Sequence, residues 1–561
     1  MSNQRKTFSF KPSRKFDSRA VSIAMLALQA FPFAHSGIAM AATVDVAPSG
    51  AAQQTPPTAA EITKSGLTNT SGSTSVMNNT DSSLLYVTSN QNNYGTLYII
   101  STNPQVSTVS IGAQNIFNAP GALITTVLPT GGLAGYANAI GNLSLNLIAV
   151  NDIINQGSIT SANNLTAFAG GVINNSGTAA LMQATNNVNL ISSTIANSGV
   201  LNAINGSVNL ANSAVFASTL ATVQQSLGNT LASIMQQNIN INNTKGVIQA
   251  LNGTVNVGGS DIAKSAILSV IGGNVLSPTF NVDAGQGAVQ VNLDQISGTV
   301  NVSACSAQLG ASSGVLTLGN INIAGDPTFF NNDDIQITGN ISVGQDLAII
   351  SSKNITSTGA HTITTTAGGI GNDVFMIAGA AFTTQGTPSP SPSLTLPPLT
   401  NALIGQQTVT VTGGSLSGGS IDLAGSTVDT RSSLADNAGG NITLVAFGGL
   451  GTGGVENAIL KTDGAGPGGS GNVAAFAGGP SGLTNTAISN ISIDSARSSK
   501  PFVPSTILFA ASTISNSSVI FNASGQAFGV FVPLTLLSHD ILASGAITTS
   551  GGGFEAKTAG V

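Results

Sequence analysis

Charge is what this chain has least of. Asp, Glu, Lys and Arg make up 6% of its 561 residues, whereas soluble proteins average about 25%. Tryptophan is absent and aromatic residues reach only 4%. Scarce charge alone does not indicate disorder, because disordered chains are also poor in apolar residues. Here hydrophobic residues reach 41% and alternate with Asn, Ser and Thr, so the chain can bury a core.

Cysteine is almost absent as well. Cys305 is the single cysteine, so an internal disulfide is excluded and rigidity must come from the fold itself. Its simplest role is that of a small core or turn residue, and a link between chains is the alternative. The sequence contains no HExxH or CxxC motif, so metalloprotease and thiolate-metal chemistry have no support, and we expect no hydrolase nucleophile elbow either.

The first 41 residues predict export. Six basic residues precede an apolar run from Ala20 to Ala34, which ends near Ala39-Met40-Ala41. This order is typical of a secretory signal peptide, and the run is shorter than the ~20 residues of a membrane span. We expect cleavage after Ala41 and no membrane span in the mature chain. Losing six basic residues and one acidic residue changes the formal net charge from −6 to about −11, which disfavours nucleic-acid binding.

A short alternation of polar and apolar residues returns along most of the chain. Examples are NLTA (164–167), NVNL (187–190), NINI (320–323), NISV (340–343) and NITL (441–444). The first apolar residues are spaced 22, 23 and 20 from Leu143 to Val208, and 25, 20, 21, 20 and 22 from Val255 to Ile363. A third run, from Ile421 to Ile491, has steps of 21, 31 and 18. Strands that recur about every 20 residues without intervening helices predict an all-β stacked solenoid.

Stacking also gives a physical reason for the unusual composition. Equivalent residues of neighbouring coils lie about 4.8 Å apart, so like charges would repel all along the stack. Uncharged Asn, Ser, Thr and Gly avoid this repulsion. Turns are expected at Asn-Gln-Gly (155–157) and at Asn-Ser-Gly (175–177 and 197–199), where Gly or Asn can adopt a positive φ.

The expected organisation has six parts. They are a signal peptide (1–41), a flexible segment (42–62), a cap with the first coils (63–140), a β-helix (141–386), a Pro/Ser-rich spacer (387–400) and a second β-helix segment with Gly-rich loops (401–561). Apolar residues at helical spacing, from Phe216 to Ile234, predict a small helical insertion at 216–237. We expect it to pack on the side of the solenoid, and a partner-binding helix is the alternative.

Candidate site residues are few, and we expect no catalytic residue and no cofactor. Asp326, Asp333 and Asp334 form the best acidic cluster, with a solvated turn as the first interpretation and calcium binding or acid/base chemistry as alternatives. His361 is isolated, and His539-Asp540 resembles a turn pair more than a catalytic dyad. Asn-x-Ser/Thr recurs at Asn164, Asn252, Asn340, Asn354, Asn441 and Asn490, where a turn Asn before a strand explains the spacing better than glycosylation.

Two longer segments carry a family resemblance. NDIINQGSITSANNLTAFAGGVINNSG (151–177) and GGSIDLAGSTVDTRSSLADNAGGNITLVAFGG (418–449) resemble filamentous haemagglutinin-type, autotransporter-like bacterial exoproteins. The resemblance covers about 141–500 and the long basic leader. It implies a right-handed parallel β-helix, here with coils of about 20–22 residues, and it implies export and a role in adhesion or biofilm. The family's NPNG-type secretion motif is not evident.

The expected function is therefore contact at the cell surface or outside the cell, as an adhesin or matrix protein without catalysis. Polysaccharide or a host surface is the expected partner, with an outer-membrane secretion partner for export. A polysaccharide lyase or hydrolase on the same fold is an alternative, and it would need Asp261, Asp283 and Asp294 on one face. A structural protein of the envelope layer, without an external ligand, is another.

Overall fold

The computed structural model describes residues 67–79, 84–86, 90–211, 237–385, 408–434, 437–449, 453–464, 469–478 and 486–494, and short segments at 507–511, 513–515, 518–520, 534–538, 540–542 and 554–558. Every regular element within these ranges is a β-strand. They belong to two compact units. The N-terminal unit holds 67–258 and 273–278, and the C-terminal unit holds 259–272 and 279–558. The expected signal peptide, flexible segment, Pro/Ser-rich spacer and helical insertion (to residue 236) lie outside the described residues.

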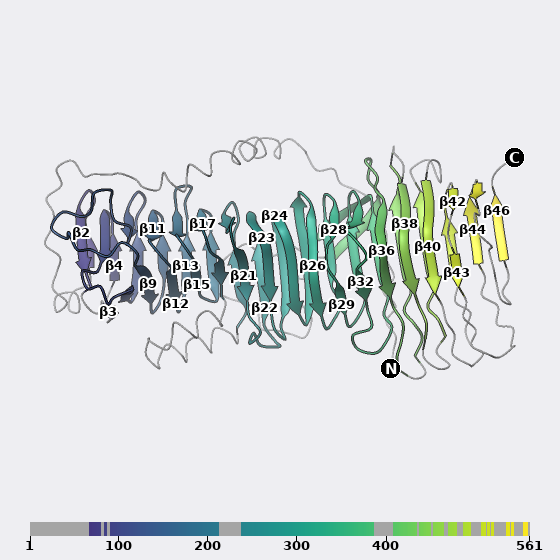
Figure 1. Ribbon diagram of the computed structural model, residues 1–561, viewed down its shortest axis with the longest axis horizontal. Coiled ribbons are helices and arrows are strands. Elements are labelled where there is room, and N and C mark those ends of the chain that lie inside the picture. Colours follow the sequence, from purple (N-terminus) through teal and green to yellow (C-terminus); the bar gives the residue numbers. More distant parts are fainter. Residues whose placement is uncertain are drawn as a thin grey trace. The chain divides into compact units, whose positions relative to one another are not determined.

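The N-terminal unit has three strands per coil, and each strand pairs in parallel with the third strand after it (Figure 1). Its first face consists of β1 (Leu67–Asn69), β4 (Asn90–Asn93), β7 (Asn115–Asn118), β10 (Ile153–Asn155), β13 (Val172–Asn175), β16 (Thr194–Asn197) and β19 (Ile239–Asn242). Its second face consists of β2 (Thr74–Asn78), β5 (Thr96–Ile100), β8 (Leu123–Thr125), β11 (Ser158–Ser161), β14 (Leu181–Ala184), β17 (Val200–Ala203), β20 (Val247–Gln249) and the start of β23 (Asn274–Asp283). Its third face consists of β3 (Leu84–Tyr86), β6 (Thr108–Ala113), β9 (Ser144–Ala149), β12 (Leu165–Ala169), β15 (Val188–Ile191), β18 (Val208–Leu210) and β21 (Thr254–Gly258).

The C-terminal unit repeats the same arrangement on faces that we call A, B and C. Face A consists of β22 (Ile267–Ile271), the start of β24 (Ala288–Ala304), β25 (Ser306–Ser313), β27 (Thr328–Asn331), β30 (Leu347–Ser351), β33 (Val374–Ala378), β37 (Ile442–Phe447), β39 (Val473–Gly478), β41 (Ile507–Ala510), β44 (Leu534–Ser538) and β46 (Phe554–Thr558). Face B consists of the first halves of β26 (Leu316–Ile323), β36 (Ile421–Asp429), β38 (Gly453–Lys461) and β40 (Thr486–Asp494), with β28 (Ile335–Ile337), β31 (Ile355–Ser357), β42 (Thr513–Ser515) and β45 (Asp540–Leu542). Face C consists of the second halves of β24, β26, β36, β38 and β40, with β29 (Ile341–Val343), β32 (Thr362–Thr364) and β43 (Ser518–Ile520).

These pairings confirm the expected fold class, a right-handed parallel β-helix. The chain visits three faces in turn before it pairs with its previous coil, and parallel crossovers of this kind are right-handed in nearly all proteins. Alternation along each strand directs every second residue inward. On the first face this produces the stack of Ile116, Ile153, Ile173, Ile195 and Ile241, each at most 1% exposed. Each coil therefore adds aliphatic side chains to a continuous core within the unit.

Coil length follows the sequence spacing only where turns are short. Neighbouring coils are 20 residues apart from Asn155 to Asn175 and again from Asn281 to Asn301. The step is 31 residues from Asn441 to Asn472, because Gly-rich loops lengthen these coils.

The sequence periodicity is also out of phase with the structure at several places, including Ile321, which pairs with Val302 and not with Val300. Leu165 pairs with Leu145, so Leu143 is not the equivalent residue. In the third run, Ile442 pairs on face A, whereas Ile421 belongs to face B. The alternation of polar and apolar residues occurs in the strands of every face, so the sequence alone does not distinguish one face from another.

A ladder of buried asparagines, which we call the asparagine ladder, runs along the corner after the first face. Seven residues, each at most 2% exposed, stack one per coil, and each of the first six donates from Nδ2 to the Oδ1 of the next at 2.6–2.8 Å: Asn69, Asn93, Asn118, Asn155, Asn175, Asn197 and Asn243. The second Nδ2 hydrogen binds a backbone carbonyl of the adjacent coil, such as the carbonyl of Val200 for Asn175, at 3.2 Å. Because every amide is both donor and acceptor, the ladder satisfies its own buried polar groups.

Glycines next to this ladder serve close approach of the backbone more than unusual φ angles. Of the three turn glycines named in the sequence analysis, only Gly177 has a positive φ, at 116°. A Cβ at Gly157 would lie 2.3 Å from the carbonyl oxygen of Ala122, and one at Gly199 would lie 2.2 Å from that of Ala180. At these two turns glycine is needed because the coils contact each other through their backbones.

Two segments cover apolar side chains that point outward. In the N-terminal unit, Leu128, Leu133, Tyr136 and Ala139 pack against Val76, Tyr98 and Ile100, and burial raises the pKa of the Tyr98 hydroxyl. In the C-terminal unit, β34 (Ala380–Gln385) pairs antiparallel with β35 (Thr408–Gly414). Phe382, Val409 and Val411 of this pair pack against Phe330 and Ile350 of face A. Since β31 pairs directly with β36, this antiparallel pair is an excursion from one coil.

Gln91 is a polar side chain of the core whose amide atoms are both without hydrogen bonds. Gln91 points inward on β4, in register between Leu67 and Ile116, and is 1% exposed. Neither its Nε2 nor its Oε1 has a hydrogen-bond partner. An amide buried without partners costs roughly 1–3 kcal/mol.

Replacing a rung of the asparagine ladder should be costly. Asn175→Ala leaves one Nδ2 hydrogen of Asn155 and the Oδ1 of Asn197 without partners, so we expect a loss of about 2–3 kcal/mol in the free energy of unfolding. Asn174→Ala is the matched control, because Asn174 is the outward-facing neighbour, and it should change stability by less than about 0.5 kcal/mol. Urea denaturation of both variants measures the difference, and equal effects would contradict the role of the ladder.

Removing the buried amide should have the opposite effect. Gln91→Leu keeps a similar side-chain volume and removes two unpaired polar groups. We therefore expect the free energy of unfolding to increase by about 1–3 kcal/mol. The control variant Asn92→Leu, at the outward-facing neighbour, should not increase the free energy of unfolding. Thermal and urea unfolding of the two variants provide the measurement, and a destabilised Gln91→Leu protein would show that the side chain is paired in solution.

Candidate functional site

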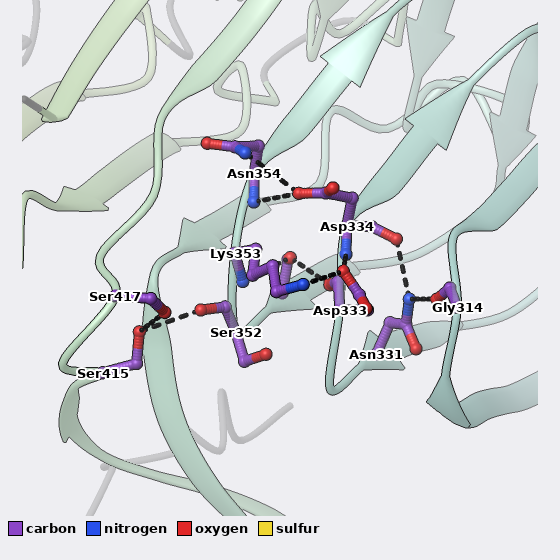
Figure 2. A network of polar contacts seen from close by, with 10 residues as sticks. Gly314, Asn331, Asp333, Asp334, Ser352, Lys353, Asn354, Ser415 and Ser417 are labelled. Carbon is purple, nitrogen blue, oxygen red and sulfur yellow. Dashed lines mark hydrogen bonds and ion pairs between the residues drawn. The ribbon is translucent and has the colours of Figure 1, made fainter. Parts of the chain in front are cut away.

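The three candidate calcium ligands do not form one cluster. Asp326 precedes β27, whereas Asp333 and Asp334 follow it, so the four-residue strand separates them by roughly 20 Å along the chain. Within the described ranges, no group of three or more His, Cys, Asp or Glu side chains is arranged to hold a metal ion. The pair Asp333-Asp334 is instead part of a polar network across consecutive turns (Figure 2).

In that network the two neighbouring carboxylates have different partners. Asp333 forms an ion pair with Lys353 at 2.6 Å, and the hydrogen bond to this carboxylate raises the pKa of the lysine. The Oδ1 of Asp334 accepts two hydrogen bonds from Asn354, one from the backbone N–H and one from Nδ2, both at 2.9 Å. Asn331 fixes the same turn from within, because its Nδ2 donates to the carbonyls of Gly314 and Asp334 at 2.7 Å. These contacts join one coil to the next.

The recurrent Asn-x-Ser/Thr asparagines play the same structural role. The Oδ1 of Asn354 accepts the backbone N–H of Ser420, and the Oδ1 of Asn441 accepts that of Asn472. Asn441 itself donates from its backbone N–H and from Nδ2 to Asp373. The expectation of a turn asparagine before a strand therefore has a geometric explanation at Asn354 and Asn441, since the side chain binds the following coil. Asn252 and Asn490 donate to the preceding coil instead, and Asn490 lies within β40.

The aspartates required by the enzyme alternative lie at different corners. Asp261 lies in the turn after β21, and Asp283 lies at the end of β23, where its Oδ1 accepts the N–H of Gly285. A Cβ at Gly285 would lie 2.5 Å from the carbonyl oxygen of Ser260, so these two turns stack on each other. Asp294 lies on β24, at the end of the part of that strand that belongs to face A, and its side chain is exposed. The structure thus brings two of the three turns together and places Asp294 elsewhere.

The serine, histidine and cysteine candidates within the described ranges are not brought together as a nucleophilic site. The one GxSxG match in the sequence, GASSG (310–314), lies along β25 and the residue after it, whereas a nucleophile elbow is a turn from a strand into a helix. The backbone N–H of His361 donates to Ser426 Oγ at 3.0 Å, and the ring Nε2 lies 3.5 Å from Thr358 Oγ1. Cys305 is a free, partly exposed thiol between β24 and β25, as a turn residue. His539 lies outside the described residues.

Charged residues on face C are limited to its later coils. Asp429, Lys461 and Asp494 are stacked in register, so their charges alternate along the ladder. Arg431 binds the Asp429 carboxylate through Nε at 2.9 Å and through Nη2 at 2.6 Å. Burial acts to raise the pKa of Asp429, but the hydrogen bonds and charges of Arg431, with the charge of Lys461, outweigh it and lower that pKa.

The earlier coils of face C present an uncharged surface, which we call the polar face. It consists of the outward side chains of the second halves of β24 and β26 and of β29 and β32, with the residues that flank them: Asn301, Ser303, Asn320, Asn322, Asn340, Ser342, Thr362 and Thr364. Register places Ser303, Asn322, Ser342 and Thr364 in one column. All eight are partly or fully exposed, in contrast to the inward residues between them.

Asparagines in the second column are held in a fixed orientation. The Oδ1 of Asn301, Asn320 and Asn340 accepts the backbone N–H of Asn320, Asn340 and Thr362, at 2.8, 3.3 and 2.9 Å. Because each carbonyl oxygen is engaged by the next coil, the Nδ2 groups of Asn320 and Asn340 are directed away from that contact. The residues of this face were visible in the sequence as repeated phrases, but their common orientation required the register.

Comparison with known proteins gives no match: no family model matches the chain, and no curated protein and no solved structure is significantly similar to it. The part of the chain that the structure describes contains no helix that is long and apolar enough to cross a membrane.

The two carboxylates of the network should differ in their effect on stability. Asp334→Ala leaves the backbone N–H and the Nδ2 of Asn354 without an acceptor. We therefore expect the free energy of unfolding to decrease by about 1–3 kcal/mol. Asp333→Ala removes an ion pair whose lysine is 46% exposed and the hydrogen bond from the backbone N–H of Asp334, so we expect a smaller loss of about 1 kcal/mol. Urea denaturation, with hydrogen exchange at the Asn354 amide, measures both variants. Equal losses would contradict this difference and show that Asp333 contributes as much to stability as Asp334.

Proposed function

We propose that this protein is an exported β-helical adhesin or biofilm-matrix protein that acts by surface contact, without catalysis, at the cell surface or in the extracellular space. The observation that supports the proposal most directly is the polar face. Its side chains are exposed and uncharged, and the asparagines of one column are anchored by backbone hydrogen bonds from the neighbouring coil. Such a surface offers many similar contacts in a row, as repeat proteins do with their extended binding surfaces.

The fold and the leader sequence support the same proposal. The basic and apolar leader before Ala41 is of the kind that directs export. The segments 151–177 and 418–449 resemble filamentous haemagglutinin-type exoproteins, and we propose that the chain shares their adhesive role and depends on an outer-membrane secretion partner. A polysaccharide or a host surface is the proposed partner.

Rigidity is what contact of this kind needs. In the C-terminal unit, which carries the polar face, the parallel pairing and the turn asparagines fix each coil to the next, so the anchored asparagines lose little conformational freedom on binding. A flexible polar chain would have to be ordered by its ligand, and that cost would be subtracted from many weak contacts.

Co-sedimentation tests the proposal. Purified protein is mixed with a panel of insoluble polysaccharides and with intact cells, and each supernatant is assayed for unbound protein and for released sugar ends. We expect retention on at least one target without sugar release, because contact requires no bond cleavage. Protein unfolded in urea and diluted with the same targets serves as the control for nonspecific adsorption.

The other outcomes identify the alternatives. Released sugar would favour a polysaccharide lyase or hydrolase, and the next variants would be Asp261→Asn and Asp283→Asn, whose turns are stacked. Absence of both retention and release would favour a structural envelope-layer protein without an external ligand.

A further inference from the structure

The polar face differs from the other candidate surfaces in having oriented hydrogen-bond donors that no protein group uses. Asn320 and Asn340 are exposed, and their Oδ1 atoms accept backbone N–H groups of the following coil. Their Nδ2 groups have no hydrogen-bond partner in the described part of the chain. Asn322, in the neighbouring column, is also exposed. The result is a set of amide donors fixed at the spacing of parallel strands, about 4.8 Å.

The charge of the surface restricts which ligand it fits. None of the eight residues of the polar face is charged, and the same column ends at acidic residues on both sides, Asp283 before it and Asp429 after it. Asp429 is already bound by Arg431. The face therefore has no cation to bind sulfate, phosphate or carboxylate groups, and Asp283 at its other end repels polyanions.

The spacing of the donors indicates a ligand that is itself periodic. A polymer with one uncharged unit per strand spacing can accept hydrogen bonds at successive coils, and each added contact is intramolecular once the first is made. Hydroxyl and ring oxygens of a neutral polysaccharide meet these requirements. The polar face carries no aromatic side chain for stacking on a sugar ring, so a single short oligosaccharide would bind weakly and a long or insoluble chain more tightly.

We propose that the polar face is the binding surface for a neutral polysaccharide, aligned along the stack of β24, β26, β29 and β32, with the Nδ2 groups of Asn320 and Asn340 as donors to its oxygens. This inference rests on the proposed adhesive function and specifies its ligand class and location. Anionic polymers are excluded by the charge of the face, and short oligosaccharides should compete poorly with long chains.

Two isosteric substitutions test the assignment. Asn320→Asp and Asn340→Asp each retain an oxygen that accepts the backbone N–H of the next coil, and each replaces the outward donor by an anionic acceptor. The matched control is Gln336→Glu on β28, which adds the same charge to face B, outside the polar face. Circular dichroism and urea midpoints establish that the three single variants and the double variant N320D/N340D remain folded.

Binding is measured by co-sedimentation with an insoluble neutral polysaccharide, such as cellulose or chitin, and with an acidic one, such as calcium alginate. We expect the unsubstituted protein to be retained by a neutral polymer and not by the acidic one. The double variant N320D/N340D should bind at least about tenfold more weakly, because it loses two donors of a multivalent contact. The control variant Q336E should bind as the unsubstituted protein does.

The outcomes separate this inference from the broader function. Retention that is unchanged in N320D/N340D, or retention on the acidic polymer alone, would overturn the polar-face assignment while leaving an adhesive function in place. If the unsubstituted protein is retained neither by any polysaccharide nor by intact cells, both the polar-face assignment and the adhesive function are overturned.

Discussion

Parallel pairing of each strand with the equivalent strand of the next coil is the constraint on which the rest of this structure depends. It places every side chain about 4.8 Å from a counterpart that has the same environment. A residue is then acceptable only if it can be stacked on a similar residue many times. Isoleucine meets the condition inside the first face, since aliphatic side chains gain contacts from both neighbours. Charged side chains do not meet it, unless their signs alternate, as in Asp429, Lys461 and Asp494.

Asparagine is well suited to this constraint, because its side chain can hydrogen-bond to a copy of itself in the next coil. Its amide has donors on one side and an acceptor on the other, so one asparagine can bind the next in the same direction without limit. Inside the N-terminal unit this property produces the asparagine ladder, where Asn155, Asn175 and Asn197 are fully or almost fully buried yet paired. On the polar face the same residue type uses only its oxygen for the stack, and Asn340 keeps its Nδ2 for solvent or ligand. Gln91 shows the contrast, because a single amide among aliphatic neighbours finds no partner at all.

The all-β solenoid could be predicted from spacing because a coil of about 20 residues repeats the polar–apolar alternation wherever the turns are short. The phase of that alternation could not be predicted, because the strands of all three faces have it; the spacing selects Leu143 where Leu145 is the equivalent residue, and it groups Ile442 with a different face. Nor could the function of Asn155, Asn175 and Asn197 be recognised, since an Asn-x-Gly sequence is also typical of an exposed turn. Asp326 and Asp333 are close in sequence, but the strand between them moves them apart. The polar face required both the register and the exposure of Asn320 and Asn340, which are properties of neighbouring coils and not of any single one.

The same stacking is the reason why we propose a binding surface and not a catalytic cleft. Acid/base catalysis needs carboxylates with different environments gathered at one place, whereas a coil-by-coil repeat gives equivalent residues equivalent environments. Departures from the repeat occur at turns, where Asp333 and Asp334 differ in their partners although they are adjacent. Even there both carboxylates are engaged in joining coils, through Lys353 and Asn354. What the repeat produces without any departure is a row of identical, weakly interacting groups. A row of this kind gains affinity from the length of its ligand, and this is why we propose a polymer as the ligand.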